Sequence, residues 1–271
     1  MMPNLSFPEP IQDLLVGYKT TGENHKTCSQ ADVYLYQPTP EDVSKHNLFV
    51  KRQNIHAAPA EADLHTERVA MSWLQGKLAV PQVMGYHRVG DIEYLVTTQI
   101  MGWSAIDERA YEDIPTLIHL LAQGLQQFHA LPFAGCPLDC RLETGLTEIK
   151  RFLVEDVLDR QSLPEDVRTL TPAAIMDTIQ AQRPASATPE DLVFTHGDYC
   201  LPNIIVQGNQ LMGFIDLGYA GIADRYRDFV SVDNSIRRNV GDEWVPLFWK
   251  AYGVEIDPDK FAFYQMLHDL I

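Results

Sequence analysis

Three side chains that offer oxygen ligands, Asp198, Asn203 and Asp216, lie close together in the last third of the chain. Mg²⁺ binds carboxylate and amide oxygens of this kind, and it fills its remaining positions with water and substrate phosphates. Asn203 and Asp216 supply one amide and one carboxylate. Asp198 then stays off the metal and is a candidate base or orienting group for an attacking hydroxyl, as the catalytic-loop aspartate is in kinases. The pattern indicates metal-dependent phosphoryl transfer.

Short apolar runs around these residues predict the strands that position them. The predicted strands are Leu192–Thr195, Ile204–Gln207 and Leu211–Ile215, with the turn Gly208–Asn209 before the last one. A hairpin that starts with Asn203 and ends at Asp216 places both side chains at its open end. We therefore expect the metal ligands to converge there.

The stretch between the first two strands reads His196-Gly197-Asp198-Tyr199-Cys200-Leu201-Pro202-Asn203. His196 and Gly197 are expected to be scaffolding, because a histidine can hydrogen-bond to the backbone and a glycine permits an unusual turn. Taken singly, Asp, Asn and Gly are also ordinary turn residues. The functional interpretation rests on their combined order.

The first hundred residues predict a small antiparallel sheet with one helix across it. The predicted strands are Leu14–Lys19, Ala31–Tyr36, Asn47–Lys51, Val83–Arg88 and Ile92–Thr98, and the predicted helix is Ala62–Leu78. Glu67 falls on the apolar stripe of that helix, where a carboxylate is costly unless it is paired. Lys51, at the end of the third strand, is the natural partner, although both residues could also lie in water at the edge of the fold.

The second half of the chain is mostly helical by the spacing of its apolar residues. The predicted helices are Ile114–Leu131, Arg141–Leu158, one opened by Thr171-Pro172, Asp224–Arg238, Trp244–Tyr252 and one that starts at Asp257-Pro258. Several helices around the short hairpin are therefore expected to form the larger part of the molecule.

Composition restricts the partners. The 271 residues have a formal net charge of −16 and no basic cluster, which argues against nucleic acid and against an anionic membrane surface. The negative net charge favours a polycationic partner. The alternative is that this charge serves only to keep the protein soluble. The four cysteines have no CxxC spacing, so we expect free thiols. Neither a leader nor a long apolar run is seen, and the expected location is the cytoplasm.

The chain resembles the aminoglycoside phosphotransferases, most closely the 3′-hydroxyl kinases, over nearly its whole length. The resemblance is most specific at His196–Asn203, Gly213–Gly218 and Ile222–Tyr226. It implies an α+β, protein-kinase-like fold with two lobes. Residues 1–98 would form the small antiparallel-sheet lobe, residues 99–102 the hinge, and residues 103–271 the mostly helical lobe that carries the catalytic hairpin.

The resemblance also implies cofactors and roles. ATP or GTP would bind with Mg²⁺, with Asp198 as the catalytic residue and with Asn203 and Asp216 as metal ligands. Lys51, positioned by Glu67, would contact the α- and β-phosphates. The remaining nucleotide contacts would come from the Ser29 hydroxyl in a polar loop, the Phe49 ring and the backbone groups of Thr98 and Ile100.

Acidic residues would bind the cationic acceptor opposite Asp198. The candidates are Glu155, Asp156 and Asp159, then Glu165 and Asp166, and finally Asp269 with the terminal carboxylate of Ile271. Two positions depart from the family pattern: Tyr219 stands where an arginine is usual, and Arg238 stands where relatives carry an acidic residue. These departures put the range of accepted drugs in question.

The function expected from this resemblance is an ATP-dependent kinase that phosphorylates a hydroxyl of aminoglycosides such as kanamycin, at the 3′ position, and thereby confers resistance. A second hypothesis is a kinase of another alcohol, such as streptomycin or a macrolide-like or choline-like compound. A third is a binding protein that keeps the fold without turnover. The expected oligomeric state is a monomer or a weak dimer.

Overall fold

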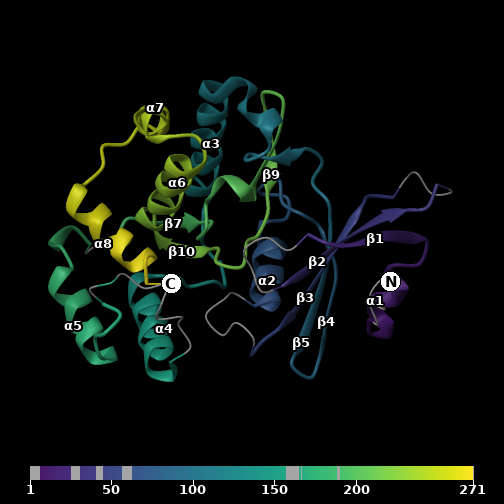
Figure 1. Ribbon diagram of the computed structural model, residues 1–271, viewed down its shortest axis with the longest axis horizontal. Coiled ribbons are helices and arrows are strands. Elements are labelled where there is room, and N and C mark those ends of the chain that lie inside the picture. The colour runs from purple at the N-terminus through teal and green to yellow at the C-terminus, as the bar shows by residue number, and fades with distance from the viewer. Residues whose placement is uncertain are drawn as a thin grey trace. The chain divides into compact units, whose positions relative to one another are not determined.

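The computed structural model describes residues 7–25, 31–40, 45–56, 63–156, 165, 167–187 and 190–270. Internal contacts divide the chain into two compact units, Met1–Met101 and Gly102–Ile271. Each unit is described by itself (Figure 1). Among the described residues, no helix is both long and apolar enough to cross a membrane.

The first unit contains an antiparallel sheet in the strand order β1-β2-β3-β5-β4. Its strands are β1 (Tyr18–Asn24), β2 (Asp32–Pro38), β3 (Leu48–Asn54), β4 (Val83–Val89) and β5 (Ile92–Thr98). Two helices accompany the sheet, α1 (Glu9–Leu14) and α2 (Leu64–Leu74). Helix α2 packs against β4 and β5, so the expected sheet with one helix between its third and fourth strands is present.

The prediction of a strand over Leu14–Lys19 is wrong at its start. Leu14 is the last residue of α1, a helix that was not predicted from the sequence, and β1 begins at Tyr18. Pro10 lies in the first turn of this helix, where its missing N–H is tolerated. Gly17 then adopts a positive φ of 84°, which redirects the chain into the strand.

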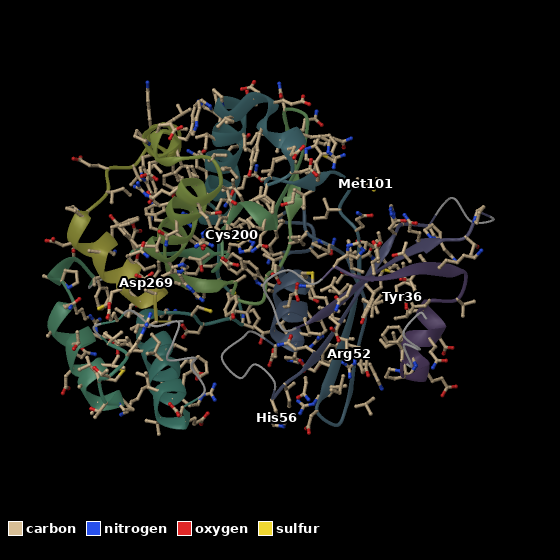
Figure 2. All side chains as sticks on the ribbon, in the orientation of Figure 1. Tyr36, Arg52, His56, Met101, Cys200 and Asp269 are labelled. Carbon is tan, nitrogen blue, oxygen red and sulfur yellow. The ribbon has the colours of Figure 1, made fainter. Side chains whose placement is uncertain are left out.

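The two faces of β3 have different surroundings, because side chains alternate along a strand. Leu48 and Val50 belong to a buried apolar cluster with residues of α1, β2 and β5, among them Tyr36 (Figure 2). Phe49 and Lys51 point to the opposite face, where Lys51 meets α2. The apolar cluster therefore holds the sheet from one side and leaves the other side to polar chemistry.

The second unit combines helices with two small sheets. Its helices are α3 (Ile114–His129), α4 (Leu142–Glu155), α5 (Pro172–Gln182), α6 (Tyr226–Asn239), α7 (Val245–Tyr252) and α8 (Pro258–His268), with the 3₁₀ turns η1 (Glu108–Asp113), η2 (Ala185–Ala187), η3 (Leu201–Asn203) and η4 (Asp242–Trp244). One sheet pairs β7 (Leu192–Thr195) with β10 (Gly221–Asp224), and the other has the order β6 (Trp103–Ser104), β8 (Ile204–Gln207), β9 (Gln210–Phe214).

The rings of Phe128, Phe194, Tyr199 and Phe214 pack together in the core of this unit. They come from α3, from β7, from the segment after β7 and from β9. All four are fully buried. Because burying aromatic surface is strongly favourable, this cluster fixes the hairpin β8–β9 and the end of β7 against α3. The residues that could do chemistry lie at the edges of these same elements.

Candidate active site

The segment that follows β7 turns sharply at Gly197. This glycine has a φ of +85°, and a Cβ built on it would lie 2.0 Å from the carbonyl oxygen of Tyr219. A real Cβ never approaches a carbonyl so closely, so only glycine fits this position. The predicted role of Gly197 as the residue that permits an unusual turn agrees with this geometry.

Both carboxylate oxygens of Asp198 are held by neighbouring side chains. The Nδ2 group of Asn203 donates to Oδ2 at 2.9 Å and also to the backbone carbonyl of Asp198 at 3.1 Å. The hydroxyl of Ser231, on α6, donates to Oδ1 at 3.2 Å. Each carboxylate oxygen can accept more than one hydrogen bond. Asp198 is therefore oriented and still able to accept a proton.

Asn203 and Asp216 flank the open end of the β8–β9 hairpin. The strand pairing ends at Ile204 and Phe214, and the N–H of Ile215 donates to the carbonyl of Asn203 at 3.0 Å. Asp216 adopts a positive φ of 61°, which is uncommon for a residue other than glycine. The hairpin thus brings Asn203 next to the segment that ends in Asp216, as the spacing of the two residues predicted.

The donor set of this hairpin end suits Mg²⁺. No group of three or more His, Cys, Asp or Glu side chains that could hold a metal is found in the described part of the chain. Mg²⁺ does not need such a cage, because it keeps several waters and binds through one or two protein oxygens plus substrate phosphates. Since the Nδ2 group of Asn203 is used by Asp198, its Oδ1 atom is the one left for a metal. Asp216 would add a carboxylate oxygen.

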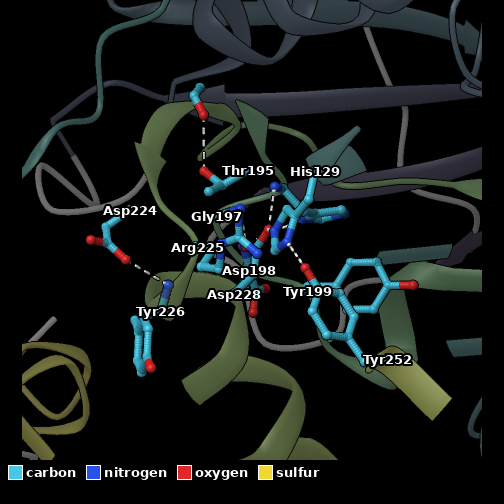
Figure 3. A network of polar contacts seen from close by, with 12 residues as sticks. His129, Thr195, Gly197, Asp198, Tyr199, Asp224, Arg225, Tyr226, Asp228 and Tyr252 are labelled. Atoms are coloured by element: carbon cyan, nitrogen blue, oxygen red, sulfur yellow. Dashed lines mark hydrogen bonds and ion pairs between the residues drawn. The ribbon is translucent and has the colours of Figure 1, made fainter. Parts of the chain in front are cut away.

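A buried aspartate on α6 anchors the turn at residues 196–198. Asp228 accepts hydrogen bonds from the backbone N–H of His196 at 2.9 Å and of Gly197 at 2.7 Å. Its Oδ2 atom also lies 3.1 Å from Nε2 of His129, and Nδ1 of His129 lies 2.7 Å from the hydroxyl of Tyr252 (Figure 3). The turn is therefore tied through one carboxylate to α3, α6 and α7.

Burial alone would raise the pKa of Asp228, but its hydrogen bond with His129 and the charges of His129 and His196 outweigh burial and lower the pKa. Asp228 is thus an ionised acceptor inside the protein. Neither Asp228 nor His129 was predicted from the sequence. Glu67 was predicted to need a partner because it is a charged residue on the apolar stripe of a helix. The same criterion applies to Asp228, since Phe229 and Val232 near it on α6 are fully buried.

His196 has the scaffolding role that was predicted for it. Its Nε2 atom lies 3.1 Å from the carbonyl of Ile215, and its Nδ1 atom accepts from the N–H of Asp198 at 3.3 Å. Cys200, labelled in Figure 2, lies close to the carboxylate of Asp198. Burial, together with the charge of Asp198, raises the pKa of this thiol, which keeps it protonated. The histidine therefore links the turn to the segment before Asp216.

In the first unit, Lys51 and Glu67 form the predicted ion pair. The Nζ atom of Lys51 lies 2.7 Å and 2.9 Å from the two carboxylate oxygens of Glu67. The Glu67 side chain is only 5% exposed and that of Lys51 is 19% exposed. The alternative, in which both residues lie in water, is therefore wrong.

The remaining predicted nucleotide residues of the first unit lie on β3 and at the end of β5. Phe49 is half-buried on the same face of β3 as Lys51, and its ring lies 6.3 Å from that of His25. Thr98 ends β5, and its N–H donates to the carbonyl of Gln82 at 2.9 Å. Ile100 follows two residues later. Ser29 lies outside the described residues.

The predicted acidic acceptor residues are only partly described. Glu155 and Asp156 end α4, with Glu155 paired to Arg151 at 2.9 Å. Glu165 is exposed. Asp269, labelled in Figure 2, follows α8 and accepts from Gln265 at 2.7 Å. Asp159, Asp166 and Ile271 lie outside the described residues.

Comparison with known proteins identifies relatives over most of the chain. A sequence model of the phosphotransferase enzyme family matches residues 31–264. An aminoglycoside 3′-phosphotransferase of Niallia circulans is 36% identical over 208 residues, which are 76% of this chain and 78% of that protein. The family model covers residues 196–203 and the β8–β9 hairpin, because both lie within its matched range.

Two solved structures share the fold. An aminoglycoside 3′-phosphotransferase of type VIII has a TM-score of 0.79 and 24% identity, over 97% of this chain and 100% of that one. An aminoglycoside phosphotransferase of Streptomyces rimosus, in complex with ADP and streptomycin, has a TM-score of 0.71 and 24% identity, over 98% and 99% of the two chains. The expected α+β, protein-kinase-like fold class is confirmed.

Proposed function

The chain belongs to the phosphotransferase enzyme family, and from this we propose that it transfers the γ-phosphoryl group of ATP to a hydroxyl group of an aminoglycoside antibiotic, at the 3′ position, and so confers resistance. The observation that carries the proposal is the fixed orientation of the Asp198 carboxylate. Its two carboxylate oxygens are oriented by Asn203 and Ser231, at the mouth of a hairpin whose end offers oxygen ligands to a metal.

Asp198 would receive the proton of the acceptor hydroxyl. A positioned carboxylate acts as a base only within hydrogen-bond distance of the hydroxyl that it deprotonates. The hydrogen bonds from Asn203 and Ser231 fix the direction of the carboxylate, and Asp228 fixes the backbone that carries it. These residues therefore supply positioning, which together with electrostatic stabilisation accounts for most of the catalysis of phosphoryl transfer.

We assign the contacts to the nucleotide's phosphates and base to residues of the first unit. Lys51 would contact the phosphates, held in place by the paired carboxylate of Glu67. The Phe49 ring and the backbone of Thr98 and Ile100 would contact the base. Asn203 and Asp216 would hold Mg²⁺, which when bound neutralises charge on the phosphate oxygens.

The 3′ position is supported by the name of the 36%-identical relative, an aminoglycoside 3′-phosphotransferase. The Streptomyces rimosus structure, which contains ADP and streptomycin, keeps streptomycin as the second candidate acceptor. The two candidates differ in the acceptor and share the chemistry at Asp198. Assays with both drugs therefore decide between them.

The test is a reaction of the protein with ATP, Mg²⁺ and either kanamycin or streptomycin, followed by mass spectrometry. We expect kanamycin to gain one phosphate, located on its 3′ oxygen. Asp198→Ala should lower kcat by about 10²–10⁴-fold, the usual effect of losing a positioned base. Asp177→Ala, which removes an exposed carboxylate of α5, is the matched control. Full activity of a folded Asp198→Ala variant would contradict the proposal.

A further inference from the structure

The face of α6 that contacts the catalytic turn also carries two arginines. Because the Ser231 hydroxyl donates to Asp198 Oδ1 at 3.2 Å, Ser231 marks the face of α6 that lies next to Asp198. Residues four before and seven after a given residue lie on the same face of a helix. Arg227 and Arg238 occupy these two positions. Both side chains therefore start from the Asp198 side of α6.

These two arginines differ from the other two arginines of this segment. Arg225 forms an ion pair with Asp191, and Arg237 forms one with Asp233. For Arg227 and Arg238, no carboxylate of the described residues lies within ion-pair distance. An arginine stays protonated in proteins. Two positive charges that are not neutralised by an ion pair of the described residues thus lie on the face of α6 that Ser231 marks.

His268, the last residue of α8, forms a charged cluster with Asp198, Asp269, Arg227 and Arg238. Helix α8 packs against α6. Burial lowers the pKa of His268; the charges of Asp269 and Asp198 oppose this effect, and those of Arg238 and Arg227 add to it. His268 is therefore within electrostatic reach of Asp198 and of both arginines. Because its pKa is lowered, His268 is largely neutral at pH 7, and the positive charge of the cluster comes from the arginines.

The four charged residues that act on His268 balance in sign. Asp198 and Asp269 contribute two negative charges, and Arg227 and Arg238 contribute two positive ones. A surface built only to attract a polycation would carry an excess of carboxylates here. The arginines therefore repel any ammonium group that the acceptor brings to this side of Asp198.

We propose that Arg227 and Arg238 determine acceptor specificity, so that the enzyme selects aminoglycosides with a neutral hydroxyl group, rather than an ammonium group, next to the hydroxyl that is phosphorylated. This inference rests on the proposed function and narrows its substrate class. At a separation of about 6 Å and an effective dielectric constant of about 40, the repulsion between two positive charges weakens binding about tenfold.

Kanamycin A and kanamycin B test the proposal directly. They differ only at the 2′ carbon, beside the 3′ hydroxyl, which carries a hydroxyl group in kanamycin A and an amino group in kanamycin B. The measured quantity is the ratio of kcat/KM for A to kcat/KM for B, at neutral pH with saturating ATP. Because the fraction of folded enzyme cancels in this ratio, a purely structural defect leaves it unchanged.

The wild-type protein should prefer kanamycin A by about tenfold. Arg227→Gln and Arg238→Gln should each reduce the preference several-fold, and the double variant should abolish it. Arg238→Lys, which keeps the charge, should retain the preference. Lys250→Gln removes a positive charge from the exposed side of α7 and should leave the ratio at its wild-type value.

A wild-type preference for kanamycin B, or a ratio that is the same in the arginine variants and in Lys250→Gln, would overturn this proposal alone. Failure of the wild-type protein to phosphorylate either kanamycin would instead overturn the proposed function. Calorimetric titration of the two kanamycins into the same variants measures the preference without turnover, so it tests the charge effect separately from catalysis. Equal affinities of the wild-type protein for both drugs in that titration would also refute the inference.

Discussion

Replacement of Asp228 by asparagine removes the charge that anchors the turn at residues 196–198. The Asp228 side chain is 0% exposed and accepts from the backbone N–H of His196 and of Gly197, with Nε2 of His129 at 3.1 Å as its third neighbour. Asparagine has one acceptor oxygen where aspartate has two, and its NH₂ group would face another donor. At least one of the three donors therefore loses its acceptor in Asp228→Asn.

The expected loss of stability follows from these contacts. A hydrogen bond to a charged group contributes about 1.5–3 kcal/mol, and breaking a buried charged pair typically costs about 3–5 kcal/mol. We expect the free energy of unfolding of Asp228→Asn to fall by about 3–5 kcal/mol. Since Asp198 follows Gly197 directly, a displacement of the turn by about 1 Å should also lower kcat by about 10²-fold. Urea denaturation and steady-state kinetics measure the two effects.

The pH dependence of this effect has a defined sign. The pKa of Asp228 is lowered in the folded protein from its ordinary value of 3.8. Its contribution to stability is therefore complete above the unfolded-state pKa, and it is lost as the pH falls through the lower folded-state value. The difference in free energy of unfolding between the wild type and Asp228→Asn should be constant from pH 7 to about pH 5 and should shrink below about pH 4.

Asp242→Asn is the control for Asp228→Asn. The Asp242 side chain is 76% exposed and lies 3.6 Å from Arg237. Surface pairs of this kind contribute little, about 0–1 kcal/mol, so this variant should resemble the wild type in stability and kcat. If Asp228→Asn also unfolds at the wild-type urea concentration and keeps its kcat, then the carboxylate of Asp228 does not hold the turn.

Three further substitutions test separate parts of the site. Gly197→Ala should lower the melting temperature measured by circular dichroism and reduce stability by more than about 1 kcal/mol, because its Cβ would meet the Tyr219 carbonyl at a positive φ; an unchanged melting temperature would contradict this. Glu67→Gln should raise the KM for ATP about tenfold in a folded protein, because it weakens the hold on Lys51; an unaltered KM would exclude that role. Asn203→Ala should raise the Mg²⁺ concentration needed for half-maximal activity, measured by titration at fixed ATP, and an unaltered titration would remove this residue from the metal site.

The elements that carry the site were predictable where the pattern is local. β5, β7 and β8 begin and end at the predicted residues, because each is a short apolar run bounded by turn signals. The pair Lys51–Glu67 was predictable because a charge on a buried helix stripe requires a partner. The strand predicted to start at Leu14 was wrong at its start because α1 has only six residues. So short a helix, followed by a glycine turn, has no apolar periodicity that distinguishes it from a strand.

The anchoring of the turn could not be predicted from local patterns. His129 ends α3 and contacts Asp228, and Tyr252 ends α7 and contacts His129, because α7 packs against both α3 and α6. Each residue alone reads as an ordinary helix-terminal or helix-flank side chain. The roles of Asp198, Asn203 and Asp216 stay predictions, which the substitution and titration experiments test.

Different residues of α6 hold the turn at residues 196–198 and, in our proposal, select the acceptor. Asp228, Ser231 and Ser235 are at most 5% exposed, and each accepts from or donates to the segment that contains Asp198; the Ser235 hydroxyl accepts from the N–H of Leu201 at 2.9 Å. Arg238, by contrast, is exposed. Buried hydrogen-bonding groups are costly to replace, whereas exposed side chains usually change stability by less than about 0.5 kcal/mol. Under the two proposals, the charges that face the acceptor can therefore vary while the geometry around the Asp198 carboxylate is preserved. An unchanged turn at residues 196–198 is then compatible with an altered range of acceptors.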